Sequence, residues 1–395
     1  MAEKRRDNKG RILRTGESQR KDGRYAYKYT DSTGKPQFVY AWKLVATDKT
    51  PTGKRDDISL REKEAEINRD IADGIDAVGK KMTVCQLYAK QNSQRADVKR
   101  ATKKQREYLM GLLRDDPLGR KSIDAVKPSD AKEWAIRMKE KGFSFQSISN
   151  YKRSLRAAFF IAIEDDCVRK NPFSFALNKV LEDNRGEKTV LTPEQEVSLI
   201  DFAQNDKVYR KYVDELIILL GTGLRISEFC GLTTNLDFKN RLIRVDHQLL
   251  RDPKSGYYIE TPKTKSGYRE IPMSEPVYQA LKRVVKNRGK KTTIMIDGYT
   301  NFLFLKRDGT PKVGMDYNNM IRNLLKKYNK QHKEPLPNIT PHSLRHTFCT
   351  RMANAGMNPK ALQYIMGHAN ITMTLDYYTH VDACSVRAEM ERLAA

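Results

Sequence analysis

The 395-residue sequence predicts a multidomain protein that is mainly α-helical with α+β parts. Three observations lead to this fold class. The chain is longer than one typical domain. Its first 78 residues combine strand-forming runs with one helical segment. Residues 80–176 carry apolar positions at helical spacing, and from residue 191 the two patterns mix. We therefore expect domains over 1–78, 80–176 and 191–395, with a polar linker over 177–190.

The N-terminal region reads as a short sheet backed by one helix. Strand formers alternate with a period of two over Arg24–Thr30, directly after Asp22-Gly23. Turn residues follow at 31–34, and Gln37–Val45 reads as the returning strand. Ser59-Leu-Arg-Glu62 has the form of a capping box, so a helix is predicted from Leu60 to about Ile75.

The second region is predicted to be entirely helical. Apolar residues recur at helical spacing in four segments, which span residues 82–91, 99–113, 127–141 and 146–163. Pro128 and Ser129 suit a helix start, and Gly142 suits a helix end. Asn171-Pro172 breaks the pattern before the linker.

The third region is predicted to be mixed. Thr192-Pro-Glu-Gln195 combines a capping box with proline at the first helical position, and a buried helix contains Glu215–Leu220. Strands are expected at Leu242–His247, Tyr257–Thr261 and Arg269–Met273. The remainder is expected to be helical, with helices around 342–355 and 360–367 and a last one over 382–395.

Composition narrows the class of partner. A formal charge of +25 and a pI near 9.7 indicate that the protein binds a polyanion. The five cysteines form no C-x-x-C pair, so a zinc site or disulfide framework is not expected, and a reducing compartment is. The apolar runs are too short to span a bilayer, and no secretory signal is recognisable. We expect a cytoplasmic protein that acts without a membrane.

Four residues in the last stretch of the chain, with one arginine upstream of them, suggest the chemistry. Arg225 and Arg345 offer planar donor forks that match two phosphate oxygens. His342, one helical turn before Arg345, and His368 add hydrogen-bonding groups. Tyr378 is a possible nucleophile, helped if an arginine-rich pocket favours its phenolate. Such a set could attack a phosphodiester without a metal.

The leaving group of that attack needs an acid. A lysine in Thr261-Pro-Lys263-Thr-Lys265-Ser-Gly267, between two predicted strands, is suitable. Each motif alone is weak: His342 suits a helix start, His368 a loop after a helix end, and Tyr377 and Tyr378 a core. Their order and spacing together are a much stronger signal.

The ordered set resembles the tyrosine recombinase (phage-type integrase) family. The resemblance rests on Thr222–Glu228, the lysine loop, His342-Ser-Leu-Arg345-His346-Thr, Gly367-His368 and Tyr378-Thr-His-Val381. The layout of nearly the whole chain is similar to integrases of Gram-positive conjugative transposons. It implies a three-stranded arm-binding sheet with a helix, a helical core-binding domain and a mixed α/β catalytic domain.

The resemblance also implies roles. Arg225 and Arg345 bind the scissile phosphate, His342 assists proton transfer, His368 donates to the phosphate, and Tyr378 forms a 3′-phosphotyrosine. Glu228 resembles the acidic residue that supports the first arginine. Energy is retained in the ester, so no nucleotide cofactor or metal is implied. The expected partners are core-type, arm-type and target double-stranded DNA, further copies in dimers and tetramers on DNA, an excisionase and host DNA-bending proteins.

Several alternatives remain open. Lys265 directly precedes the turn and is preferred as the acid over Lys263, and Tyr378 precedes Thr-His and is preferred over Tyr377. Candidate DNA contacts have a second reading as solvated faces or core; they are Lys21, Arg24, Lys28, Tyr40, Trp42, Lys99, Arg100, Lys103, Lys152, Arg153 and Arg156. A type IB topoisomerase and a non-catalytic DNA-binding regulator are the competing functions.

Overall fold

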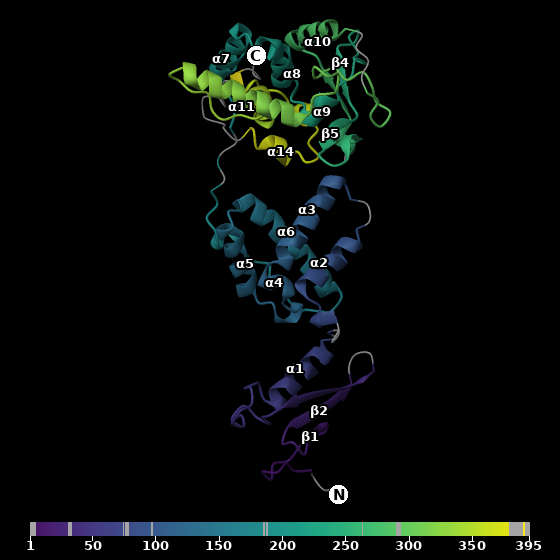
Figure 1. Cartoon of the computed structure of the whole chain (residues 1–395), viewed down its shortest axis with the longest axis vertical. Coiled ribbons are helices and arrows are strands. Elements are labelled where there is room, and N and C mark those ends of the chain that lie inside the picture. The colour runs from purple at the N-terminus through teal and green to yellow at the C-terminus, as the bar shows by residue number, and fades with distance from the viewer. Residues whose placement is uncertain are drawn as a thin grey trace. The chain divides into compact units, whose positions relative to one another are not determined.

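The computed structural model describes residues 5–30, 34–73, 75, 79–95, 98–184, 186, 189–262, 264–289, 294–378, 390 and 391. The chain divides into two compact units, residues 1–186 and 187–395. Figure 1 shows that both contain mostly helices, with strands at the start of the first unit and within the second. The predicted fold class, mainly α with α+β parts, is confirmed.

The chain opens with a three-stranded antiparallel sheet, as expected. It consists of β1 (Glu17–Gln19), β2 (Tyr25–Thr30) and β3 (Pro36–Ala41), in that order. Helix α1 (Leu60–Ala72) follows, and Ser59 and Glu62 cap it reciprocally as the capping box predicts. In β2 the side chains of Tyr25 and Tyr27, two residues apart, both lie in the core.

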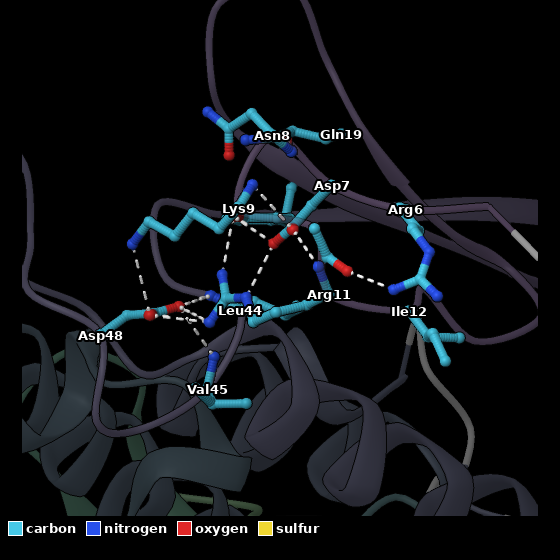
Figure 2. Close-up of polar contacts among 12 residues, drawn as sticks. Arg6, Asp7, Asn8, Lys9, Arg11, Ile12, Gln19, Leu44, Val45 and Asp48 are labelled. Atoms are coloured by element: carbon cyan, nitrogen blue, oxygen red, sulfur yellow. Dashed lines mark hydrogen bonds and ion pairs between the residues drawn. The ribbon is translucent and has the colours of Figure 1, made fainter.

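A polar network holds the residues before β1 to the loop after β3 (Figure 2). Asp7 Oδ1 accepts from the backbone N–H of Arg11 at 2.7 Å, and Arg11 Nε donates to Asp7 Oδ2 at 2.8 Å. Arg11 Nη1 also donates to Asp48 Oδ1 at 2.8 Å, and Asp48 Oδ2 accepts the Leu44 N–H at 2.9 Å. Burial raises the pKa of Asp48, but Arg11 and the backbone donors outweigh it and lower the pKa to about 2. The N-terminal segment therefore stabilises this sheet.

The rest of the first unit is a helical bundle. Its helices are α2 (Val84–Ser93), α3 (Arg100–Arg114), α4 (Pro117–Arg120), α5 (Pro128–Glu140) and α6 (Phe145–Glu164). The four predicted helices agree with α2, α3, α5 and α6, while α4 was not predicted. Trp134, Phe159 and Phe173 lie in the core of this bundle. Leu177 and Leu181, at the start of the predicted linker, are buried in the same core.

The second unit combines helices with two antiparallel strand pairs, of which only β5–β6 is a hairpin. Its helices are α7 (Pro193–Asn205), α8 (Val213–Thr222), α9 (Ile226–Gly231), α10 (Glu275–Arg288), α11 (Gly314–Gln331), α12 (Pro341–Asn354), α13 (Pro359–Met366) and α14 (Thr372–Leu375). Strands β4 (Leu242–Val245) and β7 (Arg269–Pro272) pair antiparallel, as do β5 (Gln248–Asp252) and β6 (Gly256–Glu260). The apolar helix α8 packs against α10 and α12 and places its C-terminal end beside the candidate site.

Some expectations for this unit need correction. β5 was not predicted, because its Gln248-Leu-Leu-Arg sequence lacks strand-forming β-branched or aromatic residues. Residues 294–313 were expected to be helical, but they form turns in which Asp297, Gly298, Asn301 and Gly309 have positive φ. The helix predicted over 382–395 falls outside the described residues except for 390 and 391. Within the described part of the chain, no helix has the length and apolar character needed to cross a membrane.

Candidate active site

The first arginine of the candidate site is held at the start of α9. Helix α8 ends at Gly223, whose φ of +62° is left-handed and whose added Cβ would lie 2.5 Å from the Phe348 ring. Two residues later Arg225 caps α9: its backbone N–H donates to Glu228 Oε2 at 2.9 Å and its Nη1 to Glu228 Oε1 at 2.8 Å. Glu228 thus fixes both the backbone and the guanidinium of Arg225.

The second arginine comes from the first turns of α12. Arg345 is 3% exposed, and it donates from Nη1 to the Gly223 carbonyl at 2.6 Å and from Nη2 to the Met366 carbonyl at 2.5 Å. Arg225 Nη2 donates to the next carbonyl, that of Gly367, at 3.0 Å. The two guanidinium groups therefore meet at one turn, although their residues are 120 positions apart in the sequence.

That turn carries the histidine. Gly367 ends α13 in a left-handed conformation, and His368 follows it, 5% exposed. His368 Nδ1 lies 2.9 Å from Thr374 Oγ1 on α14, so the ring has one fixed partner. Burial, and then the charges of Arg345 and Arg225, lower the pKa of His368 to about 4. The imidazole is neutral at pH 7.

The two arginines favour an anion on electrostatic grounds. Burial, and then the charge of Arg225, lower the pKa of Arg345 to about 9. Each guanidinium still has N–H groups beyond those used on carbonyls, because each carries five. A phosphate would offset the repulsion between the two arginines and accept their remaining donors.

A second arginine binds the Glu228 carboxylate that holds Arg225 in place. Arg269, on β7, donates to both oxygens of Glu228, at 2.8 and 3.2 Å. Burial raises the pKa of Glu228, but Arg269 and then Arg225 outweigh it and lower the pKa to about 2. Sequence reasoning identified Glu228 and missed Arg269. A signal was present: in the predicted strand, Arg269 alternates with Ile271 and Met273, both buried, and an arginine at a core position needs a partner.

The two tyrosines take different partners. The Tyr378 hydroxyl donates to the Met357 carbonyl at 2.5 Å, and burial raises the pKa of Tyr378. The Tyr377 hydroxyl pairs with His346 Nδ1, and burial raises the pKa of Tyr377 to about 12 although Arg345 opposes this. In this arrangement the arginines do not favour a Tyr378 phenolate, contrary to the sequence-based expectation.

The two remaining candidates lie at the solvent edge. His342, in the first turn of α12, is exposed and its ring meets His346 edge-on with centroids 4.4 Å apart. Lys265 is exposed in a short 3₁₀ turn (Lys265–Gly267) between β6 and β7. Lys263 lies outside the described residues. The exposed side chain of Lys265 is accessible to a bound substrate.

Three of the five candidate DNA contacts of the sheet lie together. Arg24 lies over the rings of Tyr40 and Trp42, with centroids 5.5 and 5.7 Å away. Tyr40 and Trp42 lie outside the apolar core cluster of this sheet, and Lys28 and Lys21 are exposed. The sequence missed Arg20 and Lys54, which lie over the rings of Tyr40 and Trp42 at 5.2 Å each.

The candidates in the helical bundle fall on two helices. Lys99, Arg100 and Lys103 lie at the start of α3, the last two exposed. On α6, Arg153 and Arg156 are exposed, and Arg156 lies over the Phe160 ring at 5.3 Å. Lys152 instead lies 4.6 Å from the Phe175 ring centroid, and burial, then Arg156, lower its pKa. Lys152 is therefore less available to a phosphate than Arg153 and Arg156 on the same helix.

An arginine pair and a neutral histidine around one turn, next to a segment with a tyrosine, are typical of an enzyme that exchanges DNA strands through tyrosine. Two family models match the chain: Phage integrase family over residues 189–384, and DNA binding domain of tn916 integrase over residues 1–71. The transposases from transposon Tn916 of Enterococcus faecalis and transposon Tn1545 of Streptococcus pneumoniae are each 67% identical over 394 residues, covering 100% of this chain and 97% of the relative. The chain therefore belongs to the phage integrase family of tyrosine recombinases.

Solved structures agree with this assignment. The Tn1549 transposon integrase in complex with a circular intermediate DNA is 63% identical, with a TM-score of 0.76 over 79% of this chain and 99% of that one. The same integrase in complex with transposon right end DNA gives 63% identity and a TM-score of 0.76 over 80% of this chain and 100% of that one.

Proposed function

We propose that this enzyme integrates and excises a mobile element, such as a conjugative transposon, by cutting and rejoining DNA through Tyr378. The observation that carries the assignment of the site is the convergence of Arg225, Arg345 and His368 on the Gly367 turn. These three side chains have the charge and the donors for one phosphodiester, and α14, which leads into the tyrosine segment, is tied to His368 through Thr374.

The proposed reaction conserves phosphoester bonds. The Tyr378 oxygen attacks phosphorus, a P–O bond to tyrosine forms, and the bond to the 5′ oxygen breaks. Lys265 gives the leaving oxygen a proton, and His342 assists removal of the tyrosine proton. Arg225 and Arg345 clamp the non-bridging oxygens while His368 donates a hydrogen bond. The 5′-hydroxyl of a partner strand then reverses the step, so no cofactor is consumed.

The DNA substrates are proposed from the relatives. Because the Tn1549 integrase binds transposon right end DNA and a circular intermediate DNA, we assign this enzyme the ends of its own element and their joined form. The remaining partners are target DNA, further copies of the chain in dimers and tetramers, an excisionase and host DNA-bending proteins. The enzyme would act in the bacterial cytoplasm, on the nucleoid.

The DNA-binding work is divided among the parts of the chain. We assign residues 1–78 to arm-type sites, 80–176 and 191–395 to the core site and catalysis, and 177–190 to the connection between the last two, whose Leu177 and Leu181 pack in the core of the bundle. The aromatic and basic face with Arg24, Tyr40 and Trp42 suits a DNA groove. The exposed cations of α3 and α6 suit phosphates.

A nicked DNA duplex that carries the element end tests the proposal. The nick releases a short strand on cleavage, so a covalent protein–DNA complex accumulates. We expect this complex with the full chain and with Tyr377→Phe, and its loss in Tyr378→Phe. If the Tyr378→Phe variant still formed the covalent complex and the Tyr377→Phe variant did not, the nucleophile would be Tyr377. Formation of no covalent complex by the unaltered enzyme on this DNA would overturn the proposal.

A further inference from the structure

Arg269 is a fully buried arginine that the reaction described above does not use. Its side chain has no exposed surface. It carries its charge on β7, where only Glu228 is a carboxylate partner among its described contacts. Burying a charged pair adds little net stability compared with an apolar pair of the same volume. A buried ion pair beside an active site therefore calls for a reason other than folding.

Its hydrogen bonds join the pieces that carry the candidate catalytic residues. Two N–H groups hold both oxygens of Glu228, which in turn holds Arg225. Nε donates to the Ile365 carbonyl at 2.6 Å, at the end of the helix that leads to His368. Nη1 also donates to the Gly267 carbonyl at 3.2 Å, in the turn that begins with Lys265. One guanidinium thus contacts three separate segments.

The atoms around Arg269 are closely packed at the Gly367 turn. A Cβ added to Gly367 would lie 3.0 Å from Arg269 Nη1 and 3.1 Å from the Ser266 carbonyl oxygen. The neighbouring Tyr364 hydroxyl accepts from the Glu270 N–H at 3.0 Å, so α13 and β7 are also joined next to Arg269. A change in the shape of this guanidinium would shift the Gly367 turn, which carries acceptors for Arg225 and Arg345.

We propose that Arg269 is a positioning residue for DNA cleavage, which acts through Glu228 and the Gly367 turn to aim Arg225 at the scissile phosphate. This inference rests on the proposed assignment of Arg225 to the phosphate. Lysine cannot replace it, because an ammonium lacks the planar fork that binds both Glu228 oxygens and a carbonyl at once. A displacement of about 1 Å at such a site can slow a reaction about 100-fold.

The test compares matched buried arginines in the full chain. Arg269→Lys is compared with Arg288→Lys, because Arg288 is also buried in this unit and donates from Nε to a carbonyl, that of Phe302, at 2.7 Å, away from the site. Arg269→Gln is a second variant, neutral and able to donate to the Ile365 carbonyl. The rate of covalent complex formation at saturating enzyme, the Kd for the nicked DNA and the Tm are measured for each.

The substrate supplies a readout that a folding defect would not change. Each rate is measured on nicked DNA with a normal scissile phosphate and with a neutral methylphosphonate, which needs less charge stabilisation by Arg225. We expect the Arg269 variants to be about 100-fold slow on phosphate, with Kd nearly unchanged. On methylphosphonate the deficit should shrink to under about tenfold, as for Arg225→Ala. Arg288→Lys should show no such difference between substrates.

Each failure has its own pattern. Arg269 variants that cleave phosphate as fast as Arg288→Lys, or that are equally slow on both substrates, would overturn the positioning role. If Arg225→Ala itself cleaved phosphate at the unaltered rate, the assignment of Arg225 to the phosphate would fail instead.

Discussion

The candidate site around Arg345 and the aromatic and basic face of the N-terminal sheet both contain arginines, but they hold them in opposite ways. Arg345 is 3% exposed and fixed by two carbonyls, and Arg225 is tied to Glu228. On the sheet, Arg24 is held by Asp22 at the surface and by the rings of Tyr40 and Trp42. A fixed fork favours one transition-state geometry, whereas an adaptable fork favours binding to many phosphates.

Conservative changes to the two kinds of arginine should separate these roles most clearly. Arg345→Lys keeps the charge but loses the fork, so cleavage of the nicked DNA should slow by about 1000-fold. Arg24→Lys should change that rate less than about threefold, because an exposed contact tolerates a flexible cation. Single-turnover rates measure both. Equal losses in the two variants would break the comparison.

The lysine loop tests whether an exposed residue can still belong to the pocket. Lys265→Ala should slow cleavage by about 100-fold, because the leaving oxygen loses its acid. A substrate whose leaving oxygen is replaced by sulfur needs no acid, and with it the deficit should largely disappear. Loss of cleavage in Lys263→Ala alone would transfer the role to Lys263.

Buried and exposed regions should also differ in how pH affects stability. The pKa of His368 is lowered to about 4 in the folded chain, against 6.5 in a free histidine. The unfolded chain therefore binds the proton first, so stability is complete above pH 6.5 and falls as the pH drops towards 4. We expect a loss on the order of 2 kcal/mol in urea unfolding over this window.

The His368→Asn variant is the control for that loss. In this variant the free energy of unfolding should change little between pH 6.5 and 4. The contribution of Glu228 to stability is lost only below about pH 4.5. An unchanged slope in His368→Asn would place the titration elsewhere.

The smallest effect is expected from the sheet. Trp42→Ala should weaken binding to arm-type DNA about tenfold and leave cleavage of a duplex with only the core site unchanged. Ile58→Ala, an exposed apolar residue before α1, should leave both unchanged. Filter binding at several salt concentrations measures the affinities. A Trp42→Ala variant that binds arm DNA normally would remove the sheet face from the interface.

Local signals predicted much of this fold. Capping residues such as Ser59 and Thr192 set helix starts within a residue, because the cap satisfies backbone donors locally. Alternation placed Tyr40 and Trp42 on one face of their strand but left open whether that face was core, and the structure puts both outside the core cluster. The β5 strand escaped detection because its pairing with β6, rather than its own composition, makes it a strand.

The candidate site was predictable as a list of residues but not as a geometry. The order of Arg225, Arg345 and His368 is readable in the sequence, whereas their meeting on the Met366 and Gly367 carbonyls arises from long-range packing. The hydrogen-bond partner of the Tyr378 hydroxyl could not be predicted either, because the Met357 carbonyl is 21 residues away and a backbone carbonyl has no sequence signal.

The Gly367 turn has a consequence for anyone who redirects this recombinase to new DNA by directed evolution. A φ of +61° and the closeness of Arg269 and Ser266 disfavour any side chain at this position. Libraries that randomise Gly367 would lose clones to inactivity whatever their DNA preference. Diversity is better placed on exposed positions of β2 and α3, such as Lys28 and Lys103, where new side chains meet solvent instead of the catalytic frame.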